Sequence, residues 1–410
     1  MTIVFFYDNF IFVIYLDNAA TTFLDENASE VYSKYACKYF FNPSAIYKQS
    51  ASIKRELYDA KEVIANAIGT SFNNNIIFTG SATEANNLAV MGSYRKIFGK
   101  MLFSSGEHPS IYNTAMELKK RGADVIFVNL TPSGEIDYND LESKLSGDVS
   151  FISIMMVSNE TGAINDLHKI AELKNKYCPN AIFHSDLVQG FGKFKINVDY
   201  FGLDMATISG HKVFGPKGIG ALYVKNKNLL SPIIFGGGQE YNLRSGTENV
   251  PAIMALATSV KNFGNLKENE LHVNECKCAF LSEIACTKTN NDYINKTALS
   301  CKINSNASPY VLSLSFMGVN GETLVHMLEE KDVLISRGSA CSSKKAGNRV
   351  LENMGLTSDE VLGSVRISFS KYTTIEEAKE AGKILNECYT TLKEKLKWKM
   401  YFYSGLVRYI

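Results

Sequence analysis

The sequence predicts an α/β protein with a doubly wound, mostly parallel sheet in a large domain and a second, smaller α+β domain. Three observations lead to this fold class. Short apolar runs recur between residues 76 and 224, helix-like segments separate them, and the character of the chain changes near residue 262. Strands of a parallel sheet are buried on both faces and are therefore almost continuously apolar, while the helices that connect them cover the two faces.

The predicted elements follow in chain order. The strands are short runs rich in β-branched and aromatic residues, and they cover residues 76–79, 101–104, 124–130, 149–157, 181–184, 205–208 and 219–224. Apolar residues at helical spacing predict helices over 53–68, 82–96, 110–121, 137–145 and 166–177.

The second domain is predicted from a change in composition. A helical stretch rich in Lys, Glu and Cys covers 262–288 and leads into a polar patch, NNDYINKT. A strand-like run, YVLSLSFM, and further helices follow. We therefore expect a large domain over 25–261 and a small domain made of 1–24 and 262–410.

Composition excludes several function classes. The 410 residues include 43 Lys and Arg against 42 Asp and Glu, a net charge of +1 that disfavours nucleic acid or an anionic membrane as the main partner. Eight cysteines are too few for a disulfide scaffold. The apolar N-terminus has no basic region and is interrupted by Asp8, so we expect a buried strand or a misassigned start rather than a signal peptide, and a cytoplasmic protein with reduced thiols.

Lys212 is the first candidate catalytic residue. It stands in Ser209-Gly210-His211-Lys212, directly after the predicted strand 205–208. A lysine that is desolvated or placed near other charges can act as a nucleophile and form a Schiff base. Taken alone, a surface-loop lysine is the commoner interpretation, and it is the neighbouring motifs that favour chemistry.

A candidate phosphate site follows strand 76–79. Thr79-Gly80-Ser81-Ala82-Thr83-Glu84 has the pattern of a capped helix start, whose free N–H groups and Thr83 hydroxyl could bind an anion. An ordinary helix cap is the simpler interpretation of this motif alone. The chain has no P-loop pattern, and its Gly-rich segments do not match a dinucleotide-binding turn, so a nicotinamide enzyme is not favoured.

Further polar groups follow other predicted strands. Asp186 ends the run AIFHSD, where a carboxylate could hold a pyridine nitrogen protonated, and Gln189 could donate to a ring oxygen. Asn159 follows strand 149–157, and His108 follows strand 101–104, where an imidazole could stack on a planar ring. Each alone is commonly a polar loop residue, but their shared position at strand ends predicts one site.

Cys341 and Arg366 are the candidates in the small domain. Cys341 lies among small residues in Ser336-Arg337-Gly338-Ser339-Ala340-Cys341, followed by two lysines that would lower the pKa of its thiol. Arg366 lies in an apolar alternating stretch, where it either pairs with a carboxylate of the chain or binds the α-carboxylate of a substrate. The polar loop around Thr247, RSGTEN, could reach a phosphate.

These motifs occur together in the order seen in one enzyme family. YLDNAATT, NPS, TGSATEANN, GEHPS, SNETG, HSDLVQG, SGHKVFGPKG, GGGQEYNLRSGTEN and SRGSACSS resemble the motifs of class V aminotransferase-fold cysteine desulfurases, from about Tyr15 to about Lys393. The resemblance implies a fold type I enzyme with pyridoxal 5′-phosphate (PLP) as cofactor.

The resemblance also implies a role for each candidate residue. Lys212 would bind the cofactor covalently, His108 would stack on its ring, Asp186 would pair with its ring nitrogen, and Cys341 would be the persulfide-forming nucleophile. The remaining assignments are phosphate binding by Ala82, Thr83, Ser209 and His211, phosphate binding in the partner subunit of a homodimer by Thr247, bonding of the ring oxygen by Gln189, and binding of the substrate by Asn42, Asn159 and Arg366.

The implied reaction converts L-cysteine to L-alanine and passes sulfur to an acceptor protein for iron–sulfur cluster assembly or tRNA thiolation. No resident metal is expected, and a transient contact of Cys341 with an iron–sulfur cluster is the one metal contact implied. A selenocysteine lyase or another class V enzyme is the alternative. The chain departs from the family at Tyr47, which replaces a usual histidine, and at Arg337, which replaces a usual small residue.

Overall fold

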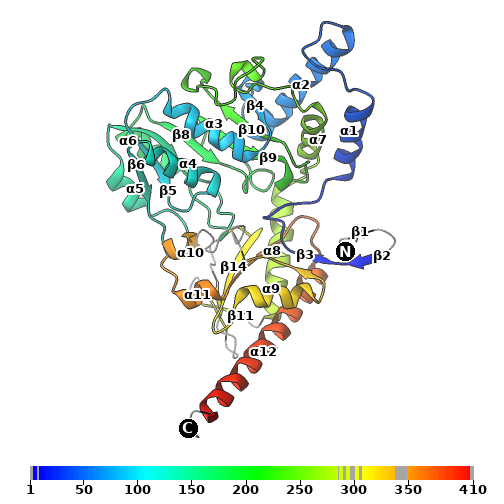
Figure 1. Ribbon diagram of the computed structural model, residues 1–410, viewed down its shortest axis with the longest axis vertical. Helices are drawn as coiled ribbons and strands as arrows, with labels where there is room; N and C mark the ends of the chain where they lie inside the picture. Colours follow the sequence, from blue (N-terminus) through cyan, green and yellow to red (C-terminus); the bar gives the residue numbers. More distant parts are fainter. Residues whose placement is uncertain are drawn as a thin grey trace.

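A seven-stranded sheet forms the centre of the upper part of the molecule in Figure 1, which shows the computed structural model. The structure describes residues 3–6, 9–284, 286–289, 292–295, 301–303, 307–337 and 349–406. In sheet order the strands are β4 (Ile76–Thr79), β10 (Gly220–Val224), β9 (Met205–Ser209), β8 (Ile182–Asp186), β7 (Val149–Ser153), β5 (Lys100–Ser104) and β6 (Val125–Val128).

Strand direction brings several strand ends to the same edge of this sheet. Strands β6, β5, β7, β8 and β9 are parallel to their neighbours, and β10 runs antiparallel to both β9 and β4. The carboxyl ends of β4, β5, β7, β8 and β9 therefore share one edge. In open α/β sheets this is the edge where ligands bind.

Helices cover both faces of the sheet, as the sequence predicts. Alternate strand residues enter opposite cores: Ile77 packs with the helices of one face, and Phe78 with those of the other. The first face carries α3 (Ala82–Tyr94) and α4 (Pro109–Lys120), and the second carries α1 (Glu26–Cys37), α2 (Lys48–Ala67), α5 (Tyr138–Lys144), α6 (Leu167–Tyr177) and α7 (Val250–Lys261).

The predicted strands and helices of this region are all present, with two differences. The predicted strand 149–157 ends at Ser153, because the following backbone leaves the ladder and keeps single hydrogen bonds, from Ile154 N to His184 O and from Met156 N to Asp186 O. Helices α1 and α7 were not predicted. They pack on each other, and α7 also packs on α2.

A separate hydrophobic core lies below the large sheet in Figure 1. It is built around a three-stranded antiparallel sheet in the order β13-β14-β16 and around the long C-terminal helix α12. Its elements are α8 (Leu266–Glu283), β13 (Cys301–Ile303), β14 (Val311–Phe316), α9 (Gly321–Glu329), β16 (Ser364–Ser368) and α12 (Ile375–Leu406).

The N-terminal segment belongs to this second core. Strand β3 (Ile14–Tyr15) pairs in parallel with β15 (Val333–Leu334), and Leu16 and Ala19 are buried in the core. We refer to the two parts as the large and the small domain. On the basis of their separate cores, we keep as a proposal the division at residues 24/25 and 261/262.

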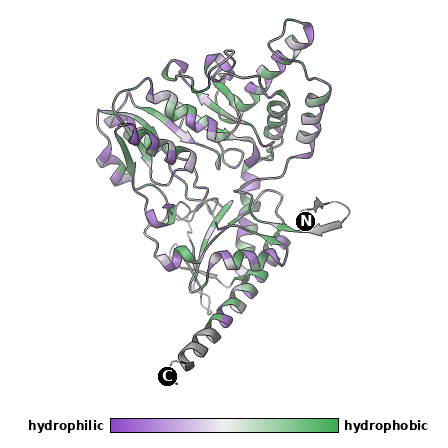
Figure 2. Cartoon of the chain, in the orientation of Figure 1, coloured by the Kyte–Doolittle hydropathy of each residue, from purple (hydrophilic) through white to green (hydrophobic). Residues whose placement is uncertain are grey.

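Short elements complete the described chain. They are β1 (Ile3–Phe6), β2 (Asn9–Phe12), η1 (Asn73–Asn75), η2 (Gly210–Lys212), η3 (Lys227–Leu229), η4 (Glu240–Asn242), β11 (Cys286–Thr289), β12 (Asp292–Asn295), α10 (Arg349–Asn353) and α11 (Ser358–Leu362). Figure 2 shows hydrophobic colours along the strands of the large sheet and hydrophilic colours on the outer helix faces. Among the described helices, none has the length and apolar character needed to span a bilayer.

Candidate active site

A cavity of about 360 Å³ opens at the carboxyl edge of the large sheet, where the two domains meet. Residues from both domains and from the N-terminal segment line it. Of the residues predicted from the sequence, the cavity is lined by Ala82, Thr83, His108, Asn159, Asp186, Gln189, Ser209, His211, Lys212 and Arg366.

Lys212 is placed in the cavity by a tight turn after β9. The turn continues through Phe214, whose backbone adopts the left-handed conformation with φ of 61°, a strained geometry for a side chain of this size. The Phe214 N–H donates to Thr22 Oγ1 at 2.8 Å, which helps to hold the turn. The Lys212 ammonium donates to Ala19 O at 2.6 Å and also to Ala20 O. The N-terminal segment thus fixes the position of the candidate nucleophile.

Asp186 lies at the end of β8 and is almost completely buried. Its Oδ1 accepts a hydrogen bond from Val188 N at 2.9 Å, and its Oδ2 accepts one from Asn86 Nδ2 at 2.8 Å. Both oxygens of this side chain are thus held in place by hydrogen-bond donors of the chain. The geometry therefore supports a carboxylate that can pair with a cationic ring nitrogen.

A second carboxyl group lies close to Asp186. Glu107 is fully buried and accepts a hydrogen bond from Met155 N at 2.7 Å, while its Oε2 has no partner among the described residues. Burial raises the pKa of Glu107 well above its usual value, and the charge of Asp186 raises it further. Two adjacent buried carboxylates do not both ionise readily. We therefore treat Glu107 as neutral.

His108 caps the N-terminus of α4 and faces the cavity. Its Nδ1 accepts a hydrogen bond from the Ser110 N–H at 3.2 Å, which requires that nitrogen to be unprotonated. Burial lowers the pKa of His108; Asp186 opposes this shift, and Lys212 and Arg349 add to it. A neutral imidazole suits a ring that packs on a planar aromatic ligand.

The N-terminus of α3 forms the predicted anion site. Ser81 caps the helix by accepting from Glu84 N at 3.2 Å, which leaves the N–H groups of Ala82 and Thr83 at the cavity wall. The predicted capping box is only half formed, because the Glu84 carboxylate binds Gly80 N and Arg244 instead of Ser81 N.

The strand β10 passes very close to this helix start. A Cβ atom on Gly220 would lie 2.6 Å from Ser81 C and 2.7 Å from Ala82 N. Glycine at this position therefore allows the helix start to sit against the sheet. His211 lies on the other side of the site, and burial lowers the pKa of its imidazole to about 4, with Lys212 lowering it further.

Arg366 extends from β16 of the small domain into the cavity, and it is buried. Its guanidinium donates to Asp17 Oδ1 at 2.8 Å and to Asn159 O at 2.9 Å. Within the described residues its Nε has no hydrogen-bond partner. The sequence left open whether Arg366 forms an ion pair or binds substrate. The structure shows the ion pair and also places the guanidinium in the cavity wall.

Three predicted residues are not part of this cavity wall. Asn42 accepts a hydrogen bond from Ser44 N in the loop between α1 and α2, away from the cavity. Thr247 lines a separate pocket beside Gly80. Cys341 lies outside the described residues. The roles assigned to all three stay predictions.

The described residues on either side of 338–348 lie near the site. Ser336 lines the cavity and exchanges two backbone hydrogen bonds with Arg366. Arg349 donates to the backbone carbonyl groups of Ser105 and Glu107, just before His108. Ser336 is thus attached to the strand that carries Arg366, and Arg349 to the loop that carries His108.

Sequence reasoning missed Asn86, Glu107, Asp17 and Arg349. Asn86 lies one turn beyond the predicted anion site in TGSATEANN, and Asp17 lies in YLDNAATT, so both were inside motifs already singled out. Glu107 directly precedes His108 in GEHPS. No local pattern marks Arg349, because its partners are more than two hundred residues away.

Comparison with known proteins identifies the class. The family model of class-V aminotransferases matches residues 14–380. The chain is 36% identical over 382 residues to a NifS/IcsS protein homolog of Lactobacillus delbrueckii subsp. bulgaricus, a match that covers 92% of this chain and 97% of the relative. It is 35% identical over 387 residues to the cysteine desulfurase IscS of Rickettsia bellii, covering 92% and 91%.

Solved structures agree with this assignment. The X-ray structure of a NifS-like protein from Rickettsia africae superposes with a TM-score of 0.80 at 31% identity and covers 92% of this chain and 100% of its own. The chain therefore belongs to the NifS/IscS-like cysteine desulfurases of the class-V aminotransferase family. Enzymes of this family depend on PLP.

The described residues fit this cofactor. The α3 N-terminus, with Gly220 packed against it, suits a phosphate group, and the buried, hydrogen-bonded Asp186 suits a protonated pyridine nitrogen. Lys212 reaches the same cavity from a third side. The anion site, the carboxylate and the lysine thus surround one space, as a planar phosphorylated aldehyde requires.

Proposed function

We propose that this chain transfers sulfur from L-cysteine to its own Cys341, releasing L-alanine, and then passes the sulfur to an acceptor protein. The observation that carries the proposal is the convergence of Lys212, Asp186 and His108 on one cavity whose small-domain wall is Arg366. The similarity to cysteine desulfurases supplies the substrate.

The site residues have separate tasks around the cofactor. PLP, when bound, draws electrons away from the substrate α-carbon. Asp186 keeps a proton on the ring nitrogen, His108 packs against the ring, and Gln189 donates to the ring oxygen. Ala82, Thr83, Ser209 and His211 bind the phosphate, which orients the cofactor relative to Lys212.

Lys212 binds the cofactor in the resting enzyme and carries protons during turnover. Its Nζ lies against two backbone carbonyl groups, Ala19 O and Ala20 O, which can accept its hydrogens while the nitrogen moves a proton from the α-carbon. Arg366 binds the α-carboxylate of the substrate by its guanidinium, and Asn159, whose carbonyl group already contacts Arg366, lines the same subsite.

The sulfur transfer balances without an external oxidant. The Cys341 thiolate attacks the substrate sulfur, a sulfur–sulfur bond forms, and the carbon–sulfur bond of the substrate breaks. The β-carbon takes the electron pair of that bond and a proton to become the methyl group of alanine. Ser336 and Arg349 hold both sides of the segment that carries Cys341 close to the site.

We also propose that the enzyme is a homodimer. Thr247 and Asn42, predicted for cofactor and substrate, lie outside the cavity of their own chain and would act across an interface. Large hydrophobic side chains are exposed on the large domain, as an interface requires; these are Phe40, Ile46, Tyr47, Phe72 and Phe235.

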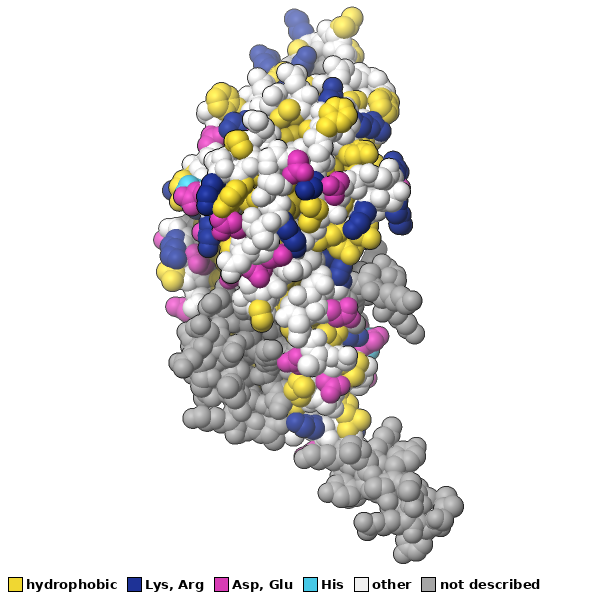
Figure 3. Space-filling model, turned by 90° about the vertical axis from the view of Figure 1, so that its left-hand side faces the viewer, with side chains coloured by type: hydrophobic (Ala, Val, Ile, Leu, Met, Phe, Trp, Pro, Cys, Tyr) yellow, Lys and Arg dark blue, Asp and Glu magenta, His cyan; other side chains and the backbone are white. Residues whose placement is uncertain are grey.

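The sulfur acceptor is proposed to be a protein, either an iron–sulfur scaffold or a tRNA-thiolation enzyme. Figure 3 shows Lys and Arg side chains mixed with Asp and Glu on the face that it presents, which does not favour direct binding of nucleic acid or a membrane. A persulfide-forming thiol works in a reducing compartment, so we propose a cytoplasmic location.

The experiment measures L-alanine and enzyme persulfide in the presence of PLP, L-cysteine and a thiol reductant. We expect a yellow protein that releases alanine, and a mass gain of one sulfur atom on the peptide containing Cys341 when the reductant is omitted. Cys341→Ala should lose the persulfide and nearly all alanine release. Cys37→Ala, at an exposed cysteine, serves as the matched control and should keep both.

Two outcomes would contradict the proposal. Lys212→Ala turning over L-cysteine at the wild-type rate would remove the assigned role of the lysine. Alanine release by the wild-type protein from L-selenocysteine but not from L-cysteine would favour the selenocysteine lyase alternative.

A further inference from the structure

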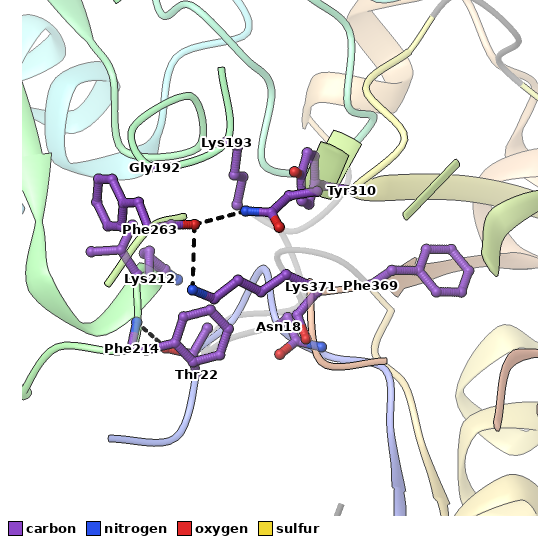
Figure 4. A pocket seen from close by; sticks show the side chains of 13 residues that line it. Asn18, Thr22, Gly192, Lys193, Lys212, Phe214, Phe263, Tyr310, Phe369 and Lys371 are labelled. Carbon is purple, nitrogen blue, oxygen red and sulfur yellow. Dashed lines mark hydrogen bonds between the residues drawn. The ribbon is translucent and has the colours of Figure 1, made fainter. Parts of the chain in front are cut away.

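A second, smaller pocket lies behind Lys212, on the side away from the cofactor cavity. We call it the rear pocket; its volume is about 30 Å³, enough for one or two water molecules. Figure 4 shows Lys193 and Phe214 of the large domain and Phe263, Tyr310 and Lys371 of the small domain around it. Lys212 lines both the rear pocket and the cofactor cavity.

Lys193 is the residue of this pocket whose function is unexplained. Its ammonium donates to Gln189 Oε1 at 2.7 Å and lies 5.7 Å from the centre of the Tyr310 ring. The backbone before it cannot shift easily, because Gly192 has a φ of 71° and a Cβ there would lie 2.8 Å from the Phe263 ring. The position of Lys193 is therefore well defined.

The contact between Lys193 and Gln189 decides which end of the carboxamide faces the cofactor site. An ammonium has only donors, so it selects the oxygen of the carboxamide and turns the nitrogen away. Gln189 Nε2 then points to the opposite side, where it donates to Ala19 O at 3.0 Å. Gln189 and Ala19 both line the cofactor cavity.

The surroundings of Lys193 are rich in positive charge. Burial lowers the pKa of Lys193 to about 7, and the cations of Lys212 and Arg366 lower it further. Lys371 and the Tyr310 hydroxyl also line the rear pocket. Below about pH 7, where Lys193 is charged, it equally disfavours a positive charge on Lys212, because electrostatic coupling is reciprocal.

We propose that Lys193 is a positioning residue of the cofactor site, which fixes the carboxamide of Gln189 toward the ring oxygen and places a positive charge behind Lys212. The inference rests on the proposed function, in which Lys212 and Gln189 contact the cofactor. The alternative is that the hydrogen bond between Lys193 and Gln189 only stabilises the turn after β8.

The test compares Lys193→Met, which removes both donor and charge, with Lys193→Gln, which keeps a donor, and Lys193→Arg, which keeps both. Lys195→Met is the matched control, since Lys195 is exposed two residues further along. Two quantities are measured on the full chain: the dissociation constant of PLP, and the pH midpoint at which the visible absorption band of the bound cofactor changes.

For Lys193→Met we expect PLP to bind roughly tenfold more weakly, the effect of losing one charged hydrogen bond at the site. We also expect the midpoint of the visible band to move to higher pH, since removal of a positive charge favours protonation at Lys212. Lys193→Gln should move the midpoint with a smaller loss of affinity, and Lys193→Arg and Lys195→Met should resemble the wild type.

A purely structural role would not move the spectroscopic midpoint, so an unchanged midpoint and affinity in Lys193→Met would overturn the inference. Failure of the proposed function is distinguishable, because then the wild-type protein itself would not bind PLP and Lys212→Ala would not alter its spectrum. If Lys193→Met does not fold, the pH midpoint of Lys193→Gln decides whether Lys193 places a positive charge behind Lys212. A midpoint equal to that of the wild type would then overturn this part of the inference.

Discussion

His184 should make the stability of the large domain strongly dependent on pH. The side chain extends from β8 and is completely buried. Its Nδ1 is hydrogen-bonded to Ser153 Oγ on the neighbouring strand β7, and its Nε2 to Thr207 Oγ1 on the other neighbouring strand, β9. Burial lowers the pKa of this imidazole from 6.5 to about 3. The folded protein therefore holds His184 neutral at neutral and mildly acidic pH.

The size of the effect follows from proton linkage. Because the pKa in the folded state is depressed, the stabilisation is fully present above pH 6.5 and is lost as the pH falls toward 3. At pH 5 the unfolded chain takes up a proton at this histidine and the folded chain does not. The difference lowers the free energy of unfolding by about 2 kcal/mol relative to pH 7.

The assay is urea unfolding followed by circular dichroism at pH 7 and pH 5, for wild type and His184→Gln. The glutamine side chain can still reach Thr207 but does not titrate. Between pH 7 and pH 5 the free energy of unfolding should therefore fall by about 2 kcal/mol less in the variant than in the wild type, whatever the stability of the variant at pH 7. His326→Gln, at an exposed histidine, is the control and should follow the wild type. An equal decrease in the free energy of unfolding of wild type and His184→Gln between pH 7 and pH 5 would refute this prediction, because it would mean that the fold does not hold His184 neutral.

Three further predictions concern the site. Glu107→Gln should keep the PLP affinity and the stability of the wild type within about 1 kcal/mol, because burial already holds the carboxyl group neutral. A large loss of PLP affinity in a titration, or of stability in an unfolding experiment, would show that the carboxyl group is ionised. Arg366→Lys should raise the KM for L-cysteine roughly tenfold or more with a smaller change in kcat, because lysine cannot reproduce the guanidinium fork; steady-state kinetics with an unchanged KM would remove Arg366 from substrate binding. Gly220→Ala should weaken PLP binding by about tenfold, since the added Cβ would displace the Ser81–Ala82 peptide group. If an equilibrium titration of this variant with PLP gives the wild-type affinity, the start of α3 is not the phosphate site.

The sequence predicted the site residues that lie at the ends of strands. Asp186 and Lys212 follow apolar strands directly, and the strand direction alone then brings them to one edge of the sheet. The helices that were missed have weaker local signals. Helix α7, VPAIMALATSVK, is apolar on nearly all sides because it packs between α1 and α2, so it lacks the one-sided pattern of a surface helix.

The groups that hold the site residues in place were not predictable in the same way. Whether Arg366 pairs or binds substrate depended on Asp17, which is 349 residues away in the chain. The raised pKa of Glu107 depends first on its burial in the folded core and then on the nearby charge of Asp186. Local patterns contain no information on such distant pairs, and a single sequence reveals them only through resemblance to a family.

The N-terminal segment from Asp17 to Thr22 explains how the small domain is coupled to the catalytic lysine. Its Ala19 carbonyl group accepts hydrogen bonds from both Lys212 and Gln189, so one peptide group positions two residues that contact the cofactor in the proposed mechanism. Two residues earlier, Asp17 pairs with Arg366 of the small domain.

Asn18, between these residues, donates to Ser368 O on the strand that carries Arg366. A substrate carboxylate that competes with Asp17 for Arg366 therefore acts on the same short segment that holds Lys212. The ion pair between Asp17 and Arg366 is thus linked, through Asn18 and Ala19, to the carbonyl group that accepts the Lys212 hydrogen bond, so a change at Arg366 has a short path to the candidate nucleophile.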